Sequence, residues 1–172
     1  MSTGDGVEVG IVGREGVPEA LSLLGPAPGV TDCFVQVAAT ALRLDFHRFE
    51  QEFFSQEPVR RAILSYIQYS SLLTAQIAAC NRLHDVEERL ARWLLMVADR
   101  VGDTKFYLTQ EFLAEMIGSR RTSVTLSAGA LKRSGLIKYQ RGHVEIVDRE
   151  SLEDSACECY SISRRLLVNL NT

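Results

Sequence analysis

The sequence predicts an α+β protein built from short strand fragments, one long helix, and a C-terminal helix pair followed by a β-hairpin. Residues 7–12 alternate apolar and polar side chains with a period of two, which is typical of a strand. From Pro58 onward the apolar residues recur with the period of a helix. After residue 108, two short helical patterns are separated by a glycine and followed by two β-rich runs. We therefore expect three regions, 1–57, 58–83 and 84–172.

Composition places the chain among ordinary folded proteins. Its 172 residues are 46% hydrophobic and 24% charged, which is close to the average for globular domains. No apolar run reaches the ~18–20 residues that cross a bilayer, and the N-terminus lacks the basic and apolar stretches of a secretory signal. We expect a cytoplasmic protein without a membrane partner. The four cysteines are too few and too irregularly spaced for a disulfide framework.

The first region has the pattern of an incomplete sheet. Residues 7–12, 34–37 and 41–44 are the expected strands, and a short helix over 18–24 ends at the Gly-Pro-rich cluster 25–29. Three short strands leave unpaired edges. This region is therefore expected to be part of a larger β-domain whose N-terminal portion is absent from this chain.

The long helix over 58–83 carries two apolar stripes. One stripe contains Tyr66, Tyr69, Leu73, Cys80 and Leu83. The other is expected to be a dimerisation seam, and its members are Ile63, Ile67, Ser70, Thr74 and Ile77. Two stripes call for two partners, so one face should pack in its own domain and the seam should pack on a second copy. A long helix buried within a single domain is the alternative.

The C-terminal region predicts a winged helix. A helix capped by Asp85 should end at Gly102, and a second, capped by Thr109, should end at Gly118. A third helix, Arg120–Arg133, should follow a Ser119 cap. Small Ala114 permits a close crossing of the last two helices, the glycine makes the turn, and Val124 locks the pair, as in a helix-turn-helix. Residues 135–139 and 144–147 form the expected hairpin, with a basic tip at 140–143.

The charge pattern and the exposed face of the third helix point to nucleic acid. Residues 118–149 hold seven basic and two acidic side chains, whereas 150–159 hold four acidic and no basic ones. Arg121 could read guanine, Thr122 and Thr125 either base edge, and Leu126 a thymine methyl. The other side chains are better placed for phosphates. The full predicted DNA-contacting set is Thr109, Gln110, Ser119, Arg120, Arg121, Thr122, Ser123, Thr125, Leu126, Gly129, Lys132, Arg133, Lys138, Arg141 and His143.

Residues 108–124 and 131–137 resemble the DNA-binding end of the Crp/Fnr family of bacterial transcription regulators, and 81–91 resemble the family's hinge. The resemblance implies a winged-helix regulator of transcription that binds an inverted-repeat operator in double-stranded DNA as a homodimer. It also implies an N-terminal β-roll of the cyclic-nucleotide-binding type as the sensory domain, here truncated. RNA polymerase is a further candidate partner.

The sequence departs from this family at several positions. Residues 13–16 and 32–35 stand where members that bind cyclic nucleotide hold the ribose and phosphate, but the phosphate arginine is missing. The N-terminal cysteine cluster of iron–sulfur members is also absent. Thr122 and Leu126 replace a glutamate and a second arginine of the recognition helix, so the preferred DNA sequence should differ. We expect no cofactor.

No catalytic, cofactor or metal site is expected, and the chain lacks the pattern of an enzyme. Cys157 and Cys159, if placed on one helix, would point about 200° apart, which opposes joint metal ligation. His47, His84 and His143 fall on three different predicted elements. An alternative function is a protein-interaction module that modulates full-length relatives by heterodimerisation without touching DNA.

Overall fold

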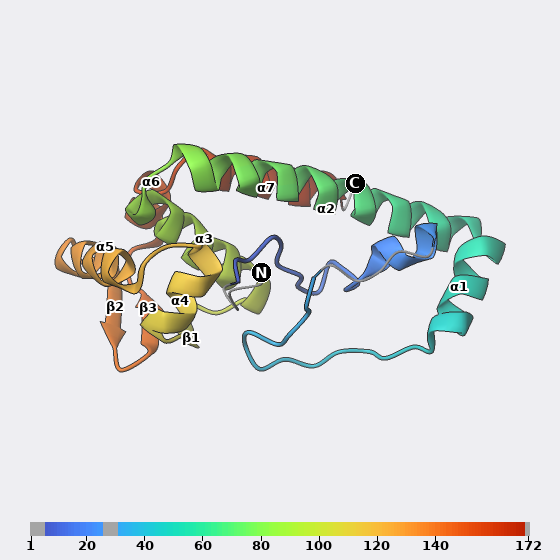
Figure 1. Ribbon diagram of the computed structural model, residues 1–172, viewed down its shortest axis with the longest axis horizontal. Helices are drawn as coiled ribbons and strands as arrows, with labels where there is room; N and C mark the ends of the chain where they lie inside the picture. The colour runs from blue at the N-terminus through green and yellow to red at the C-terminus, as the bar shows by residue number, and fades with distance from the viewer. Residues whose placement is uncertain (1–5, 26–30, 171–172) are drawn as a thin grey trace.

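Two long helices lying side by side form the spine of the molecule. The computed structural model describes residues 6–25 and 31–170. In it, α2 (Glu57–Leu83) packs along α7 (Cys159–Leu170), with α1 (Phe46–Ser55) at one end and the small sheet at the other (Figure 1). Pro58 lies in the first turn of α2, where its fixed φ suits a helix start. None of the described helices is long and apolar enough to cross a bilayer.

Helix α3 (Val86–Val101) is the centre of the core. Every residue from 89 to 98 is buried, and the helix packs against α4, α5, α6 and α7. The predicted ends are confirmed. The Asp85 carboxylate accepts from the backbone of Glu87 and Glu88, and Gly102 closes the helix at φ 74°, in the left-handed region that favours glycine.

Buried Arg89 joins three helices where the chain turns from α2 into α3. Its Nη1 donates to the carbonyl oxygens of Asn81 and Ile117, both at 3.2 Å, and its Nε donates to Asp85 O at 3.3 Å. Asn81 lies in the last turn of α2, and Ile117 ends α4 (Gln110–Ile117). A cation is favourable at these negative helix ends. Arg89 therefore fixes the angle between the spine and the C-terminal module, which is residues 105–146 with α4, α5 and a small sheet.

The C-terminal module contains a three-stranded antiparallel sheet. Strand β3 (His143–Ile146) lies between β1 (Lys105–Tyr107) and β2 (Ile137–Gln140). The hairpin of β2 and β3 confirms the predicted β-runs, whereas β1 was not predicted, because three residues are too few for a recognisable alternation. The α+β fold class is confirmed.

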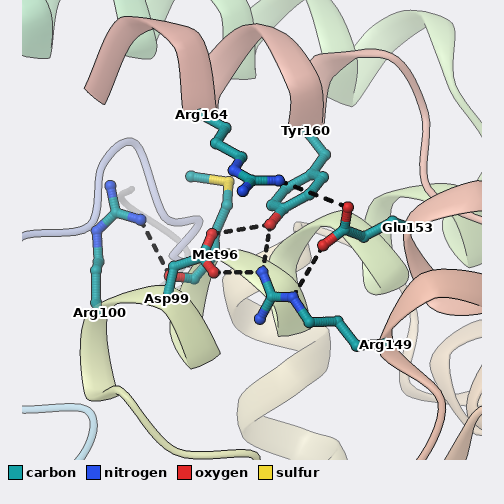
Figure 2. A network of polar contacts seen from close by, with 7 residues as sticks. All are labelled: Met96, Asp99, Arg100, Arg149, Glu153, Tyr160 and Arg164. Carbon is teal, nitrogen blue, oxygen red and sulfur yellow. Dashed lines mark hydrogen bonds and ion pairs between the residues drawn. The ribbon is translucent and has the colours of Figure 1, made fainter. Parts of the chain in front are cut away.

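A polar network ties the last two helices to α3. Figure 2 shows Arg149, the first residue of α6 (Arg149–Asp154), donating to Asp99 Oδ1 at 2.5 Å and to the Tyr160 hydroxyl at 2.6 Å. Tyr160 donates to Asp99 Oδ2 at 2.9 Å, and Arg149 Nε donates to Glu153 at 2.9 Å. Because Arg149, Asp99 and Tyr160 each bond the other two, the side chains hold α3, α6 and α7 in one arrangement.

The strands predicted before residue 57 are wrong. Residues 6–25 and 31–57 contain no strand, and the short helix is a 3₁₀ helix, η1 (Ala20–Leu24). The predicted apolar face of 7–12 is also disrupted, because Val7 and Val9 are 47% and 45% exposed and Glu8 is buried, while Ile11 packs against the core. Alternation alone favours a strand, but a strand needs a neighbour to pair with. The segment instead crosses the helices as a single extended chain, and Val9 O accepts from Thr74 of α2 at 3.1 Å. Residues 26–29 of the predicted loop lie outside the described residues.

The helix predicted over 58–83 is confirmed, but two residues of its expected seam are buried by this chain. Ile63 and Ile77 belong to the core, and Ile67 packs against it. Ser70 is half-buried and Thr74 is exposed. The reason is that α1, α7 and η1 all pack on α2, and only Thr74 and Leu83 of the two predicted stripes stay exposed. Ile63 and Ile77 are therefore not free to form a seam with a second copy.

The carboxyl group of Glu8 anchors the N-terminal segment to α3. Its Oε1 accepts from Trp93 Nε1 at 3.0 Å, and its Oε2 accepts from Gln36 at 2.6 Å. Burial raises the pKa of Glu8 above its usual 4.5, although these two hydrogen bonds and the charges of Arg92 and Arg100 act in the opposite direction. The buried site therefore disfavours the ionised carboxylate.

Replacing Glu8 with glutamine should raise the melting temperature at neutral pH by a few degrees. The pKa of Glu8 is higher in the folded state than in the unfolded state. Its contribution to stability is therefore fully present below the unfolded-state pKa and is lost as the pH rises through the folded-state pKa. Glutamine does not ionise, and Gln36 can rotate its amide to remain a partner. The difference in melting temperature between E8Q and the parent should widen from about pH 4 to pH 7. A constant difference across this range would contradict the raised pKa.

Candidate nucleic-acid interface

The turn between α4 and α5 (Arg121–Arg133) is fixed by backbone hydrogen bonds. The Thr109 hydroxyl accepts from Phe112 N at 3.2 Å at the start of α4, which confirms the predicted cap. Gly118 ends α4 at φ 62°, and a Cβ there would lie 2.7 Å from Val7 Cγ2. Any other side chain would meet both backbone strain and a clash. Ser119 N then donates back to Ala114 O at 2.9 Å, which closes the helix end.

The start of α5 differs from the prediction by one residue. The helix begins at Arg121, and Arg120 occupies its cap position without a side-chain hydrogen bond. The Ser119 cap is therefore wrong, because Arg120 still has extended backbone (φ −68°, ψ 139°) and is itself the last residue before the helix. The predicted inward face is confirmed: Val124, Ala128 and Leu131 are at most 2% exposed, and α5 packs against α3 and α4. This packing holds the opposite face of α5 toward solvent.

The predicted DNA-contacting side chains lie on the surface of one module. Those that are half-buried are Gln110, Ser119, Ser123 and Gly129. Those that are exposed are Thr109, Arg120, Arg121, Thr122, Thr125, Leu126, Lys132, Arg133, Lys138, Arg141 and His143. Leu126, on the outer face of α5, is 73% exposed.

Positive charge concentrates at the N-terminus of α5. Arg120 and Arg121 are exposed there, and the first turn holds no acidic side chain. Among the described residues, neither arginine makes a salt bridge. The helix dipole adds partial positive charge at the same end. This end can therefore bind an anion without first breaking an internal ion pair.

A side-chain contact connects the starts of α4 and α5. The Thr125 hydroxyl lies 2.9 Å from Gln110 Oε1 and 2.9 Å from Arg121 O, both of which can accept from it. Both Gln110 and Thr125 belong to the predicted contact set, so the structure brings together polar groups that are fifteen residues apart in the chain. They form one continuous polar edge beside Arg121.

The hairpin tip forms a tight two-residue turn. Arg141 and Gly142 have φ values of 50° and 84°, and this pair of positive values is typical of a type I′ turn. A Cβ on Gly142 would lie 2.6 Å from the Tyr107 ring, so only glycine fits. The same tyrosine packs edge-on against His143, with 5.2 Å between ring centroids. Arg141 thus stands at the end of the wing on a defined backbone.

Two basic side chains of the wing share one carboxylate. Lys138 and Lys105 each lie 3.4 Å from an oxygen of Glu145. Lys105 and Tyr107 were not predicted as part of this surface, because both lie on the unpredicted strand β1. Tyr107 is 58% exposed. Phe106, the apolar residue between them, is buried, and that three-residue alternation was the only available signal.

Comparison with known proteins identifies the module. Residues 88–155 match the model of the Crp-like helix-turn-helix domain family. FixK2 from Bradyrhizobium japonicum has a similar fold, with a TM-score of 0.59 and 14% identity over 64% of this chain and 58% of that one. Two CRP-family transcriptional regulators from Thermus thermophilus give TM-scores of 0.54 and 0.52 at 20% and 22% identity, each over 59% of this chain and 55% of the other.

The chain spans little more than half the length of these regulators. No curated protein matches it. The matched segment 88–155 contains α4, α5, β1 and the β2–β3 hairpin, which are the elements that carry the exposed basic surface. Residues 88–155 are therefore similar to the Crp-like helix-turn-helix domain, and about 60% of the chain shares its fold with transcriptional regulators of the Crp/Fnr family.

Proposed function

We propose that this protein is a regulator of transcription that binds double-stranded DNA through α5. The observation that carries the proposal is the outer face of this helix, where Arg120 and Arg121, without a salt bridge in the part of the chain that the structure describes, stand beside exposed Thr122, Thr125 and Leu126. The second helix of a helix-turn-helix fits the major groove of DNA when its outer face is exposed. The Crp-like match over residues 88–155 supports the same function.

The contacts divide into two kinds by their position. Arg121 in the first turn of α5 points to base edges, where a guanidinium can bond guanine O6 and N7 together. Lys132 lies in the last turn of α5 and Arg141 at the wing tip, both away from the first turn of α5, and these positions suit contacts to phosphates. The first kind should determine which sequence is bound, and the second should add affinity for any duplex.

Salt dependence tests the function directly. We expect affinity for a duplex selected from random DNA to fall by about a thousand-fold between about 50 and 200 mM salt if the complex makes at least six phosphate contacts. Lys132→Ala and Arg141→Ala should each reduce the salt slope by about one unit, because each removes the cation that neutralises one phosphate. Fluorescence anisotropy with a labelled duplex measures both quantities. Weak binding that is insensitive to salt would contradict the proposal and favour the protein-interaction alternative.

The proposed form is a homodimer on an inverted repeat, and an uncovered face of α2 supports it. Leu64 and Leu72 are 43% and 50% exposed and lie opposite the buried face of the helix. The same arc of about 100° contains exposed Ala75 and Ala79 and no charged side chain between residues 64 and 79. An uncharged stripe along a helix of this length suits pairing with an identical helix across a two-fold axis.

Placing charges on this stripe should separate the dimer. We expect Leu72→Lys combined with Ala79→Lys to give monomers at micromolar concentration, because four lysines would face one another across the seam. Leu42→Lys is the matched control, since Leu42 is fully exposed outside the helix. Sedimentation velocity distinguishes the species. A dimeric double variant, or a parent protein that is monomeric at every concentration, would contradict the assignment.

A further inference from the structure

Four metal-binding side chains meet where α2 ends and α7 begins. Cys80 and His84 lie one helical turn apart at the end of α2, and Cys157 and Cys159 flank the start of α7. One ligand atom from each lies within 4.8 Å of all the others. The three cysteines are at most 4% exposed, and the sequence alone places the two pairs more than seventy residues apart.

Cys157 and Cys159 do not share a helix, so the prediction that their thiols point apart is wrong. Helix α7 begins at Cys159, and Cys157 lies in the turn before it. Both thiols can therefore face Cys80. The sequence also showed no metal-ligand partner for His84, because Cys159, which lies beside it, comes 75 residues later in the chain.

The distances fit one tetrahedral centre. Cys80 Sγ lies 3.5 Å from Cys157 Sγ, and Cys159 Sγ lies 3.6 Å from His84 Nδ1. Zn–S bonds of about 2.3 Å and Zn–N bonds of about 2.0 Å at tetrahedral angles place ligand atoms about 3.6–3.8 Å apart. These two separations are close to those of ligands around a zinc ion, and the other pairs of ligand atoms lie within 4.8 Å, so small side-chain shifts would complete the tetrahedron.

The surrounding side chains orient the ligands. His84 Nε2 lies 3.1 Å from the Glu158 carboxylate, to which it can donate its proton. Nδ1 then keeps its lone pair on the side of Cys159. A carboxylate bound to the outer nitrogen of a metal-ligating histidine is a recurrent arrangement in zinc sites. In addition, the side-chain amide of Gln76 donates to Cys159 Sγ at 3.1 Å.

A buried positive charge lies close to the cluster. Arg92 is 2% exposed, its Nη1 bonds the sulfur of Met96, and its Nε has no hydrogen-bond partner among the described residues. The charge of Arg92 acts on the Cys80 thiol. Three thiolates, one neutral imidazole and Zn²⁺ carry a net charge of −1, which would compensate this guanidinium.

We propose that Cys80, His84, Cys157 and Cys159 bind a structural zinc ion. Binding displaces the thiol protons to solvent and forms three Zn–S bonds and one Zn–N bond. Four protein ligands close the coordination sphere, so the ion has no open position for a substrate. Its role is to fasten the start of α7 to the end of α2, beside the joint made by Arg89.

The metal content and coordination of the full chain test this site. Protein purified without chelator should contain about one zinc per chain by mass spectrometry of the elements. After removal of zinc, titration with Co²⁺ should produce the intense visible absorption and thiolate charge-transfer bands of a tetrahedral sulfur-rich site. Zn²⁺ should then displace the cobalt, and restoring zinc to the stripped protein should raise its melting temperature.

Single substitutions distinguish the proposed zinc ligands from a cysteine outside the cluster. Cys80→Ser and Cys159→Ser should lose the cobalt spectrum, whereas Cys33→Ser should keep it, because Cys33 is exposed and outside the cluster. Glu158→Gln should weaken zinc binding by about 10–100-fold through loss of histidine orientation. The Glu158 side chain is 69% exposed, so this variant should fold even where a cysteine variant does not. Competition with a chromophoric chelator measures the affinity.

Three results would overturn the proposal. The first is parent protein that neither retains zinc nor gives the cobalt spectrum. The second is a Cys33→Ser variant that loses metal as completely as Cys80→Ser. The third is a Cys80–Cys157 disulfide, found by peptide mass mapping of protein kept under reducing conditions, which would assign the cluster to thiol chemistry instead.

Discussion

Replacing Trp93 with alanine should lower the free energy of unfolding by about 3–5 kcal/mol. Trp93 is 1% exposed at the centre of α3, and its ring packs against Phe112 of α4. Alanine would leave a cavity between α3 and α4. It would also remove the N–H that Glu8 accepts, leaving a buried carboxyl oxygen without that donor. Urea denaturation followed by circular dichroism measures the loss.

Two further variants divide this loss into its causes. Trp93→Phe keeps much of the ring volume but removes the donor, and should cost about 1–3 kcal/mol. Leu126→Ala changes an apolar side chain that is 73% exposed, and should stay within about 0.5 kcal/mol of the parent. A decrease of less than about 1 kcal/mol for Trp93→Ala would show that the N-terminal segment is not docked on α3 in solution.

Replacing Arg121 with alanine should cost about 1–3 kcal/mol of DNA binding per half-site and relax the preference at one guanine. The side chain is exposed at the N-terminus of α5 and makes no salt bridge among the described residues. Its removal should therefore leave the fold intact, which circular dichroism checks. Competition between the selected operator and a scrambled duplex, at several salt concentrations, measures specificity separately from affinity.

Lys132→Ala is the matched control for this experiment. Lys132 lies on the same helix, and its ammonium lies 3.4 Å from Tyr139 O. It should weaken the operator and the scrambled duplex alike, since a phosphate contact carries no sequence information. If Arg121→Ala also weakens both duplexes equally, Arg121 contacts the phosphate backbone and does not read a base.

The C-terminal module could be predicted because its local signals agree with its tertiary contacts. Thr109 and Asp85 cap helices, Gly102 and Gly118 end them, and Val124 packs inward, as their types and spacing indicate. The one-residue error at Ser119 has a local cause as well. Arg120 keeps extended backbone, so the helix begins one residue later than the favourable capping side chain of Ser119 indicates.

The N-terminal half could not be predicted, because its conformation depends on distant partners. The alternation of residues 7–12 is real, but the docking of Glu8 on Trp93, 85 residues away, decides which side faces inward. Similarly, Ile77 is buried in a core whose other members come from both earlier and later segments of the chain. The cysteine cluster shows the same limit, since its two halves meet only after the C-terminal module has folded.

The central position of α3 makes the elongated molecule a single cooperative unit. One side of this helix packs toward the spine and the other toward the C-terminal module, and the Arg89 guanidinium bonds the ends of both α2 and α4. Neither half can lose structure without uncovering the apolar surface of the other. Any ligand that binds only the folded form at one end of the molecule therefore stabilises the other end by the same free energy.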